Sequence, residues 1–279
     1  MPTDALLPDP WAFLRRHTPA RIALGRSGGS LPTARALELA HAQALARDAV
    51  QAPFDADEFA ARLRPLDPGV LVLRSAAGSR AQFLARPDLG RRLCPESERV
   101  LGALPEQARG RGLVILVSDG LSALAAWRQA PGLLAALLPR LEARGFTRAP
   151  LLVVRHARVG IVDPVGSALR AEMALILLGE RPGMASPDSL GAYFAYGPGP
   201  GRTDGDRNCV SNIRPEGLAH EAAAEKIAAL LAASRHLRLS GVGLKEGPDA
   251  ASLSAAQSPA PLGIGSSGCG AIPGPDQVR

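Results

Sequence analysis

The segment 113–122 constrains the fold more than any other part of this 279-residue chain. Five consecutive apolar residues, Leu113–Val117, are followed at once by the polar, glycine-containing run Ser118–Ser122. A continuous apolar run of this length is typical of a strand buried on both faces, and a polar loop followed by a helical stretch is typical of a parallel sheet. The sequence therefore predicts an α/β fold, with a mostly parallel, Rossmann-like sheet and flanking helices.

The remaining elements follow from hydrophobic periodicity and from turn residues. Buried strands are predicted at 70–73, 151–155 and 171–178, and shorter extended segments at 81–85, 159–162 and 190–196. Helices are predicted at 9–17, 33–51, 55–64, 95–109 and 217–237. A helical region at 121–144 is expected to break at Pro131-Gly132, because proline removes a backbone donor and clashes with the preceding turn.

Composition divides the chain into three predicted parts. Residues 1–65 form a helical N-terminal arm, and residues 66–244 form the α/β domain. Residues 245–279 consist mostly of Gly, Pro, Ser and Ala without any aromatic residue, which predicts a disordered tail.

Several classes of protein are disfavoured. No apolar run approaches the roughly 20 residues of a membrane span, and the N-terminus lacks the charge and apolar core of a signal peptide. The net charge is +6, but the arginines are spread singly among acids and aromatic residues make up only 4%, so no nucleic-acid partner is expected. Three separated cysteines, Cys94, Cys209 and Cys269, indicate a reduced, cytoplasmic chain without a disulfide framework or a metal site.

The usual signatures of a self-sufficient enzyme are missing. There is no phosphate-binding glycine loop and no nucleophile elbow, and the five histidines lack metal-ligand spacing, so they are expected to be surface or helix-face residues. Ligands of open α/β sheets bind at the carboxyl ends of the strands. The first places to look are therefore three strand-end positions, Asp119, Val159 and Glu180.

Two polar segments each allow two interpretations. The segment Gly179–Gly183 places Glu180 directly after a buried strand, and is either a ligand-facing turn or an ordinary surface turn. The segment Asp206–Ile213 precedes the last helix, and is either a ligand-contacting cluster or a helix-capping segment in which Cys209 is a small packing residue.

As an ordered set, the polar motifs resemble the small (light) subunit of ethanolamine ammonia-lyase. The motifs that carry this resemblance are 9–11 (Asp-Pro-Trp), 18–33, 40–43, 47–50, 86–93, 119–122, 179–183, 186–190, 206–207, 211–213 and 240–241. Each of them is weak alone, but together they run in the family's order across residues 9–241.

The resemblance implies a subunit of an adenosylcobalamin-dependent lyase that converts ethanolamine to acetaldehyde and ammonia. It implies a large-subunit partner, a β/α barrel with the catalytic residues, in a hetero-oligomer of several large–small pairs. Carried over by position, the family's cobalamin contacts are Val159, Glu180 and Cys209, with no catalytic or metal-binding residue on this chain. The glycines around Glu180 would let the backbone approach a planar ligand closely.

One sequence feature differs from other cobalamin-binding enzymes, and another differs from part of the ethanolamine ammonia-lyase family. The Asp-x-His-x-x-Gly motif of other cobalamin enzymes is missing, since His156 lacks the preceding aspartate. The segment before Asp9 is short, whereas members with long N-terminal extensions are packaged in bacterial microcompartments. This difference argues against packaging, so the cytoplasm is the expected location and a bacterial microcompartment is the alternative. The alternative functions are a stand-alone α/β nucleotide-binding enzyme and a basic scaffold or nucleic-acid-binding protein.

Overall fold

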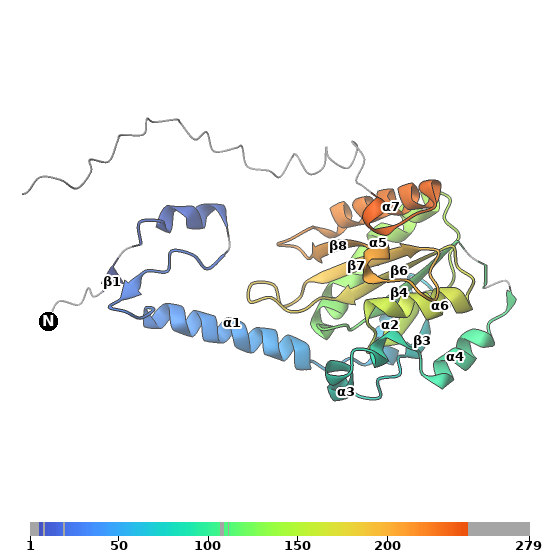
Figure 1. Ribbon diagram of the computed structural model, residues 1–279, viewed down its shortest axis with the longest axis horizontal. Helices are drawn as coiled ribbons and strands as arrows, with labels where there is room; N and C mark the ends of the chain where they lie inside the picture. The colour runs from blue at the N-terminus through green and yellow to red at the C-terminus, as the bar shows by residue number, and fades with distance from the viewer. Residues whose placement is uncertain (1–5, 8, 19, 107–108, 111, 245–279) are drawn as a thin grey trace, which may run out of the picture. The chain divides into compact units, whose positions relative to one another are not determined.

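The computed structural model describes residues 6–7, 9–18, 20–106, 109–110 and 112–244, and its main element is a six-stranded sheet covered by helices (Figure 1). Its strands lie in the order β3-β5-β4-β6-β7-β8. Their bounds are β3 Leu71–Arg74, β4 Leu113–Ser118, β5 Leu152–Arg155, β6 Met173–Gly179, β7 Leu190–Tyr196 and β8 Asn208–Ile213. The first four strands of that order are parallel, and β7 and β8 are antiparallel to their neighbours. The predicted mostly parallel α/β sheet is confirmed.

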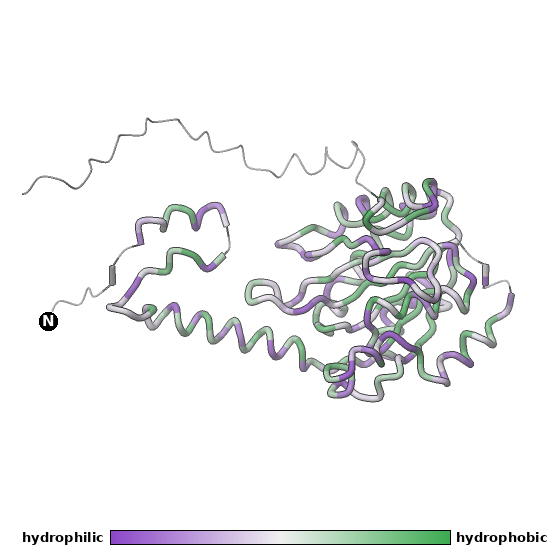
Figure 2. Tube along the Cα trace, viewed as in Figure 1, coloured by the Kyte–Doolittle hydropathy of each residue, from purple (hydrophilic) through white to green (hydrophobic). Residues whose placement is uncertain are grey.

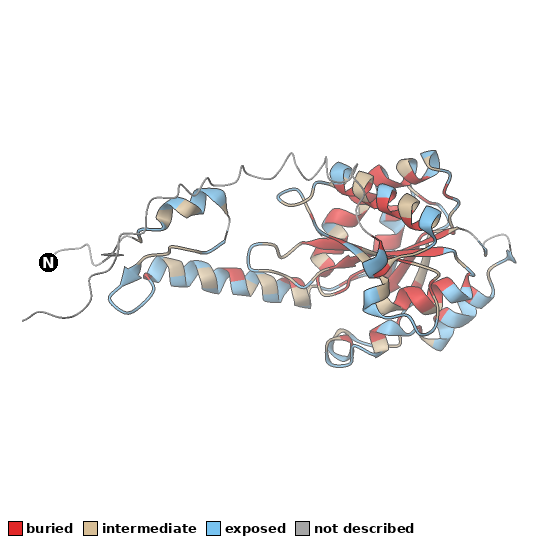
Figure 3. Ribbon diagram, turned by 45° about the horizontal axis from the view of Figure 1, so that its top comes forward, coloured by how far each residue is buried: buried red, intermediate tan, exposed pale blue. Residues whose placement is uncertain are grey.

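Helices cover both faces of the sheet, which explains the continuous apolar runs in the sequence. Every residue of β4 and β6 is buried, and successive side chains of β4 enter two different cores. One core lies under α2 (Ala56–Leu63), α5 (Ala123–Ala143) and α7 (His220–Leu237), and the other lies under α4 (Pro95–Gly102) and α6 (Val162–Ala168). Figures 2 and 3 show these apolar and buried residues concentrated in the strands and the facing sides of the helices.

The N-terminal part is helical, as predicted. It contains the two-residue strands β1 (Leu6–Leu7) and β2 (Arg26–Ser27), the 3₁₀ helix η1 (Ala12–His17) and the helix α1 (Thr33–Gln51). Helix α1 buries only Ala42 and Ala49, so most of its surface is exposed (Figure 3). Helix α2, predicted at 55–64, is capped by the Asp55 carboxylate and contributes Phe59 and Leu63 to the core beside α5. The predicted tail 245–279 lies outside the described residues.

The structure corrects three of the predicted elements. Residues 80–85 form a helix, α3 (Arg80–Ala85), because the Ser79 hydroxyl caps it by accepting from the Gln82 amide. Residues 159–161 form the 3₁₀ helix η4 (Val159–Ile161), which leads directly into α6. Helix α5 does not break at 131–132, since its apolar face is buried throughout and the packing stabilises the helix across the lost hydrogen bond.

Two further segments differ in length or type. Helix α4 ends at Gly102 rather than at 109. The polar segment 206–213, for which no strand was predicted, contains β8, which pairs with β7 at the edge of the sheet. Its polar residues are compatible with a strand because an edge strand has one open side.

Candidate functional site

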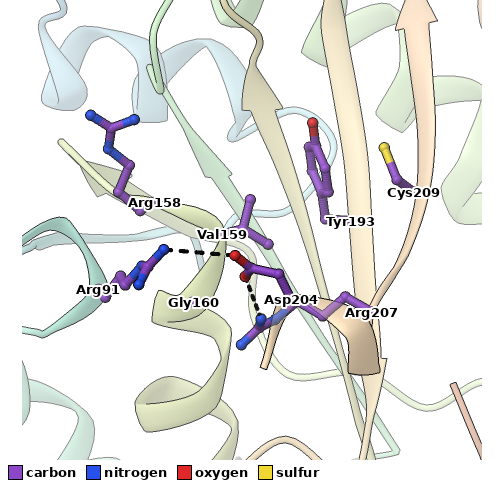
Figure 4. Close-up of a pocket in the computed structure, with 8 residues that line it drawn as sticks. All are labelled: Arg91, Arg158, Val159, Gly160, Tyr193, Asp204, Arg207 and Cys209. Carbon is purple, nitrogen blue, oxygen red and sulfur yellow. Dashed lines mark hydrogen bonds and ion pairs between the residues drawn. The ribbon is translucent and has the colours of Figure 1, made fainter. Parts of the chain in front are cut away.

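An arginine-lined cavity of about 370 Å³ lies on the sheet face that carries α6 (Figure 4). Its walls come from the segments around η4 and β8 and from β7. The lining residues are Arg91, Arg158, Val159, Gly160, Tyr193, Asp204, Arg207 and Cys209. The structure therefore brings together Val159 and Cys209, which are 50 residues apart in the sequence, whereas the third predicted contact, Glu180, does not line this cavity.

Local backbone geometry explains how these residues meet. Strand β5 ends at Arg155, and His156 adopts a left-handed backbone with φ of 61°, which turns the chain toward η4 and Val159. On the opposite wall, Cys209 of β8 is the register partner of Tyr193 of β7. Because paired residues of adjacent strands point to the same face, both side chains reach the cavity.

Glu180 lies next to the cavity and is held there by three donors. Its Oε2 accepts hydrogen bonds from the Ser189 hydroxyl and, at 3.3 Å, from the backbone amide of Asn212. Its Oε1 accepts a hydrogen bond from the Tyr193 hydroxyl at 3.3 Å. Gly191 makes room for this arrangement, since a Cβ there would lie 2.7 Å from Oε1 of Glu180. A carboxylate offers about four acceptor positions, so one of them remains on Oε1.

The thiol and the phenol of the cavity are both protonated at neutral pH. Cys209 is exposed at the cavity wall, but the surrounding protein displaces part of its water, and this effect and the Glu180 carboxylate raise the pKa of Cys209 to about 11, although Tyr193 partly offsets the rise by hydrogen bonding. Loss of water contact is also the main reason why the pKa of Tyr193 is raised. Cys209 is therefore a neutral, weakly polar contact group and not a thiolate nucleophile at pH 7.

The charged residues of the cavity were not predicted from the sequence. Arg207, whose side chain is 4% exposed, pairs with Asp163 and with Asp204 at 2.7 Å. Arg91 reaches Asp204 at 3.7 Å, as the dashed lines of Figure 4 show. The sequence signals for these residues are the adjacency of Arg158 to Val159 and the presence of Arg91 and Arg207 in two of the family motifs, 86–93 and 206–207. Their proximity in space depends on long-range packing, which the sequence does not reveal.

Asp119, another strand-end position, lies in the interior rather than at the cavity. Its side chain is 1% exposed and accepts from Nη1 of Arg80 at 2.9 Å, from Nδ1 of His156 at 3.0 Å and from the His156 amide at 2.7 Å. The expectation that every histidine is a surface or helix-face residue is therefore wrong for His156. These contacts give Asp119 a structural role, joining the ends of β4 and β5 to α3.

Gly179, the glycine beside Glu180, is required by the packing of the backbone around it. A Cβ on Gly179 would lie 2.0 Å from the Ser122 carbonyl oxygen and 2.4 Å from that of Asp119. Gly179 thus permits close approach between the end of β6 and the loop after β4, and not the approach to a planar ligand that the sequence suggested.

Two general findings bear on the kind of site. Within the described residues there is no group of three or more His, Cys, Asp or Glu side chains that is arranged to hold a metal ion. None of the helices in this described part is long and apolar enough to cross a membrane.

The fold and the site together define a Rossmann-like α/β protein with an arginine-lined cavity on one face of its sheet. The chain belongs to the ethanolamine ammonia-lyase light chain family, whose sequence profile matches residues 8–245.

Full-length relatives support this membership. The ethanolamine ammonia-lyase small subunit of Azotobacter vinelandii is 51% identical over 251 residues, which cover 90% of this chain and 93% of that protein. The small subunit of Ralstonia nicotianae is 48% identical over 248 residues, covering 88% and 92%. The small subunit of Pseudomonas putida is 48% identical over 242 residues, covering 85% and 88%.

Proposed function

We propose that this chain helps to enclose adenosylcobalamin against a large subunit that converts ethanolamine to acetaldehyde and ammonia. The observation that carries the proposal is the convergence of Val159 and Cys209 on one cavity, with Glu180 joined to it through Tyr193. The family resemblance implies these three contacts, and Val159 and Glu180 are also strand-end positions. Two of the three line one cavity, and the third lies at its margin.

The chemistry of these side chains fits the periphery of a corrin ring. That periphery carries neutral amide groups, which donate hydrogen bonds, between apolar methyl groups. The remaining acceptor position on Glu180 suits an amide donor, and Val159 and the protonated thiol of Cys209 suit the apolar surface. When bound, adenosylcobalamin supplies radical chemistry through homolysis of its cobalt–carbon bond. The residues of this chain hold and orient the cofactor and limit its contact with water.

The large subunit is the expected source of the catalytic groups. The one buried histidine–carboxylate pair in the described residues, His156 with Asp119, is part of the fold. We therefore expect the chain alone to have no lyase activity. The partner is proposed to be a β/α barrel in a hetero-oligomer of several large–small pairs, and packaging in a bacterial microcompartment stays a prediction.

The exposed apolar residues of the N-terminal part support a partner subunit. Trp11 is 62% exposed, Phe13 50%, Leu37 65% and Leu45 45%. Four large, exposed apolar side chains on a segment that buries few residues favour a protein–protein contact. We propose that the large subunit covers them.

The test is co-expression of the chain with an ethanolamine ammonia-lyase large subunit. The purified complex is titrated with adenosylcobalamin by equilibrium dialysis, and acetaldehyde and ammonia are measured with ethanolamine as substrate. We expect cofactor-dependent activity from the complex and none from the single chain. Turnover by the single chain, or a complex that is active without cobalamin, would contradict the proposal.

A further inference from the structure

The arginine-lined cavity carries an excess of positive charge. Three guanidinium groups line it against one carboxylate, Asp204. Asp204 and Asp163 both pair with Arg207, and Arg91 is 3.7 Å from Asp204 with a side chain that is 58% exposed. Arg158 has no carboxylate within 4.0 Å among the residues that the structure describes. The cavity therefore has room for an anion to balance its charge.

Arg158 is fixed in place although its charge is not compensated. Its side chain passes over Gly90, where a Cβ would lie 2.7 Å from Cγ of Arg158. Its guanidinium lies 4.3 Å from the centre of the Phe83 ring and donates to the Phe83 carbonyl at 3.3 Å, while its Nε has no partner in the described part of the chain. In Figure 4 this guanidinium points away from Asp204. The Arg158 side chain is therefore held in place by Phe83 and Gly90, but no carboxylate of the described residues neutralises its charge.

The environment of Arg158 also disfavours its charge. Burial, followed by the nearby Arg80 and Arg91, lowers the pKa of Arg158. A bound anion would offset this cost, because charge-assisted hydrogen bonds between guanidinium and phosphate are among the strongest in proteins.

We propose that Arg158, together with Arg91, forms a subsite for the phosphodiester of the cobalamin nucleotide loop. This inference rests on the proposed function. The amides around the corrin ring are neutral, so the phosphodiester is the one peripheral group of the cofactor that is anionic. Its oxygens match the planar fork of an arginine, and Arg158 precedes the proposed corrin contact Val159 in the sequence.

The experiment compares three ligands on the large–small complex by equilibrium dialysis. Cyanocobalamin carries the phosphodiester and the lower base, cobinamide methyl phosphate carries a phosphodiester without the base, and cobinamide carries neither. The variants are Arg158→Gln and Arg158→Lys. The matched control is Arg170→Gln, because Arg170 is a 60% exposed arginine paired with Glu106 and does not line the cavity.

We expect Arg158→Gln to lower the affinity of the complex for cyanocobalamin and for cobinamide methyl phosphate by about ten- to a hundredfold. Its affinity for cobinamide should stay the same within about twofold. Arg158→Lys should lose less affinity, since it keeps the charge, and Arg170→Gln should lose none. Raising the salt concentration should weaken cyanocobalamin binding more in the wild type than in Arg158→Gln.

Three outcomes would overturn the subsite: equal losses for all three ligands, no loss for any of them, or a loss confined to cyanocobalamin, which would indicate a contact with the base. If Arg158→Gln fails to associate with the large subunit, Arg91→Gln tests the same subsite with an exposed side chain. A wild-type complex that binds none of the three ligands would refute the proposed function itself, and the subsite with it. Binding by the wild type without the expected pattern would refute the subsite alone.

Discussion

The hydroxyl of Tyr193 donates to Oε1 of Glu180 over 3.3 Å and thereby connects the carboxylate after β6 to the arginine-lined cavity. Tyr193 contributes to the cavity wall, whereas Glu180 does not line the cavity. Glu180 also accepts hydrogen bonds from the Ser189 hydroxyl and from the backbone amide of Asn212. The position of the carboxylate is thus determined by β7 and β8 as well as by the strand that delivers it.

Replacing Glu180 by alanine should weaken the affinity of the large–small complex for cobalamin by about ten- to a hundredfold, because hydrogen bonds to a charged acceptor contribute about 1.5–3 kcal/mol. The fold should survive, since Glu180 is a half-buried turn residue and not part of either core. A cofactor titration beside a melting curve checks both statements. Unchanged affinity would show that Glu180 is only a turn residue.

A substitution at Gly191 tests the same site without touching the carboxylate. The Cβ of Gly191→Ala would lie 2.7 Å from Oε1 of Glu180 and 2.7 Å from Cε2 of Tyr193, so both side-chain ends must shift. Cobalamin affinity should fall by about three- to tenfold, less than on removal of the carboxylate. The control is Gly102→Ala, whose Cβ meets nothing within 4 Å. If the two variants bind cobalamin equally well, the geometry around Glu180 does not matter for binding.

The sequence predicts those parts of the fold in which local pattern and burial agree. Leu113–Val117 was assigned correctly because only a strand covered on both faces accommodates such a run. The edge strand β8 was missed because Asn208, Ser211 and Asn212 leave no hydrophobic run. The unbroken α5 was missed because burial of residues such as Leu133 and Leu134 outweighs the local effect of Pro131, which no local pattern reveals.

The site was predicted less completely than the fold. Val159 and Glu180 were found as strand-end positions, whereas Cys209 was identified only through the family resemblance. Tyr193 and Arg91 were not found, because their place at the cavity depends on strand pairing and on contacts between distant segments. Which of these residues contact a cofactor stays a prediction until binding is measured.

Asp119→Asn should destabilise the chain by about 3–5 kcal/mol, because removing one member of a buried ion pair leaves its partner uncompensated. The partner here is Arg80, whose side chain is 17% exposed and whose pKa is already lowered by burial. The control is Asp88→Asn, since Asp88 forms ion pairs at the exposed surface, where water and salt screen them, so this variant should unfold at nearly the same urea concentration as the wild type. Urea unfolding measures both, and similar costs for the two variants would contradict a buried role for Asp119.

Asp67 should make stability depend on pH in the acid range. Burial alone would raise its pKa, but hydrogen bonds from Arg148 and from the amides of Leu151 and Gly69, each amide at 2.9 Å, outweigh burial, so the pKa of Asp67 is lowered. A lowered folded-state pKa gives stability that is fully present above the unfolded pKa of about 3.9 and is lost as the pH falls through the folded value. Asp67→Asn should therefore be less stable than the wild type at pH 7, and the difference should shrink below about pH 4. Urea unfolding of both proteins between pH 7 and pH 3 measures it, and a difference that stays constant or widens toward acid would show that the Asp67 carboxylate is not stabilised by these contacts.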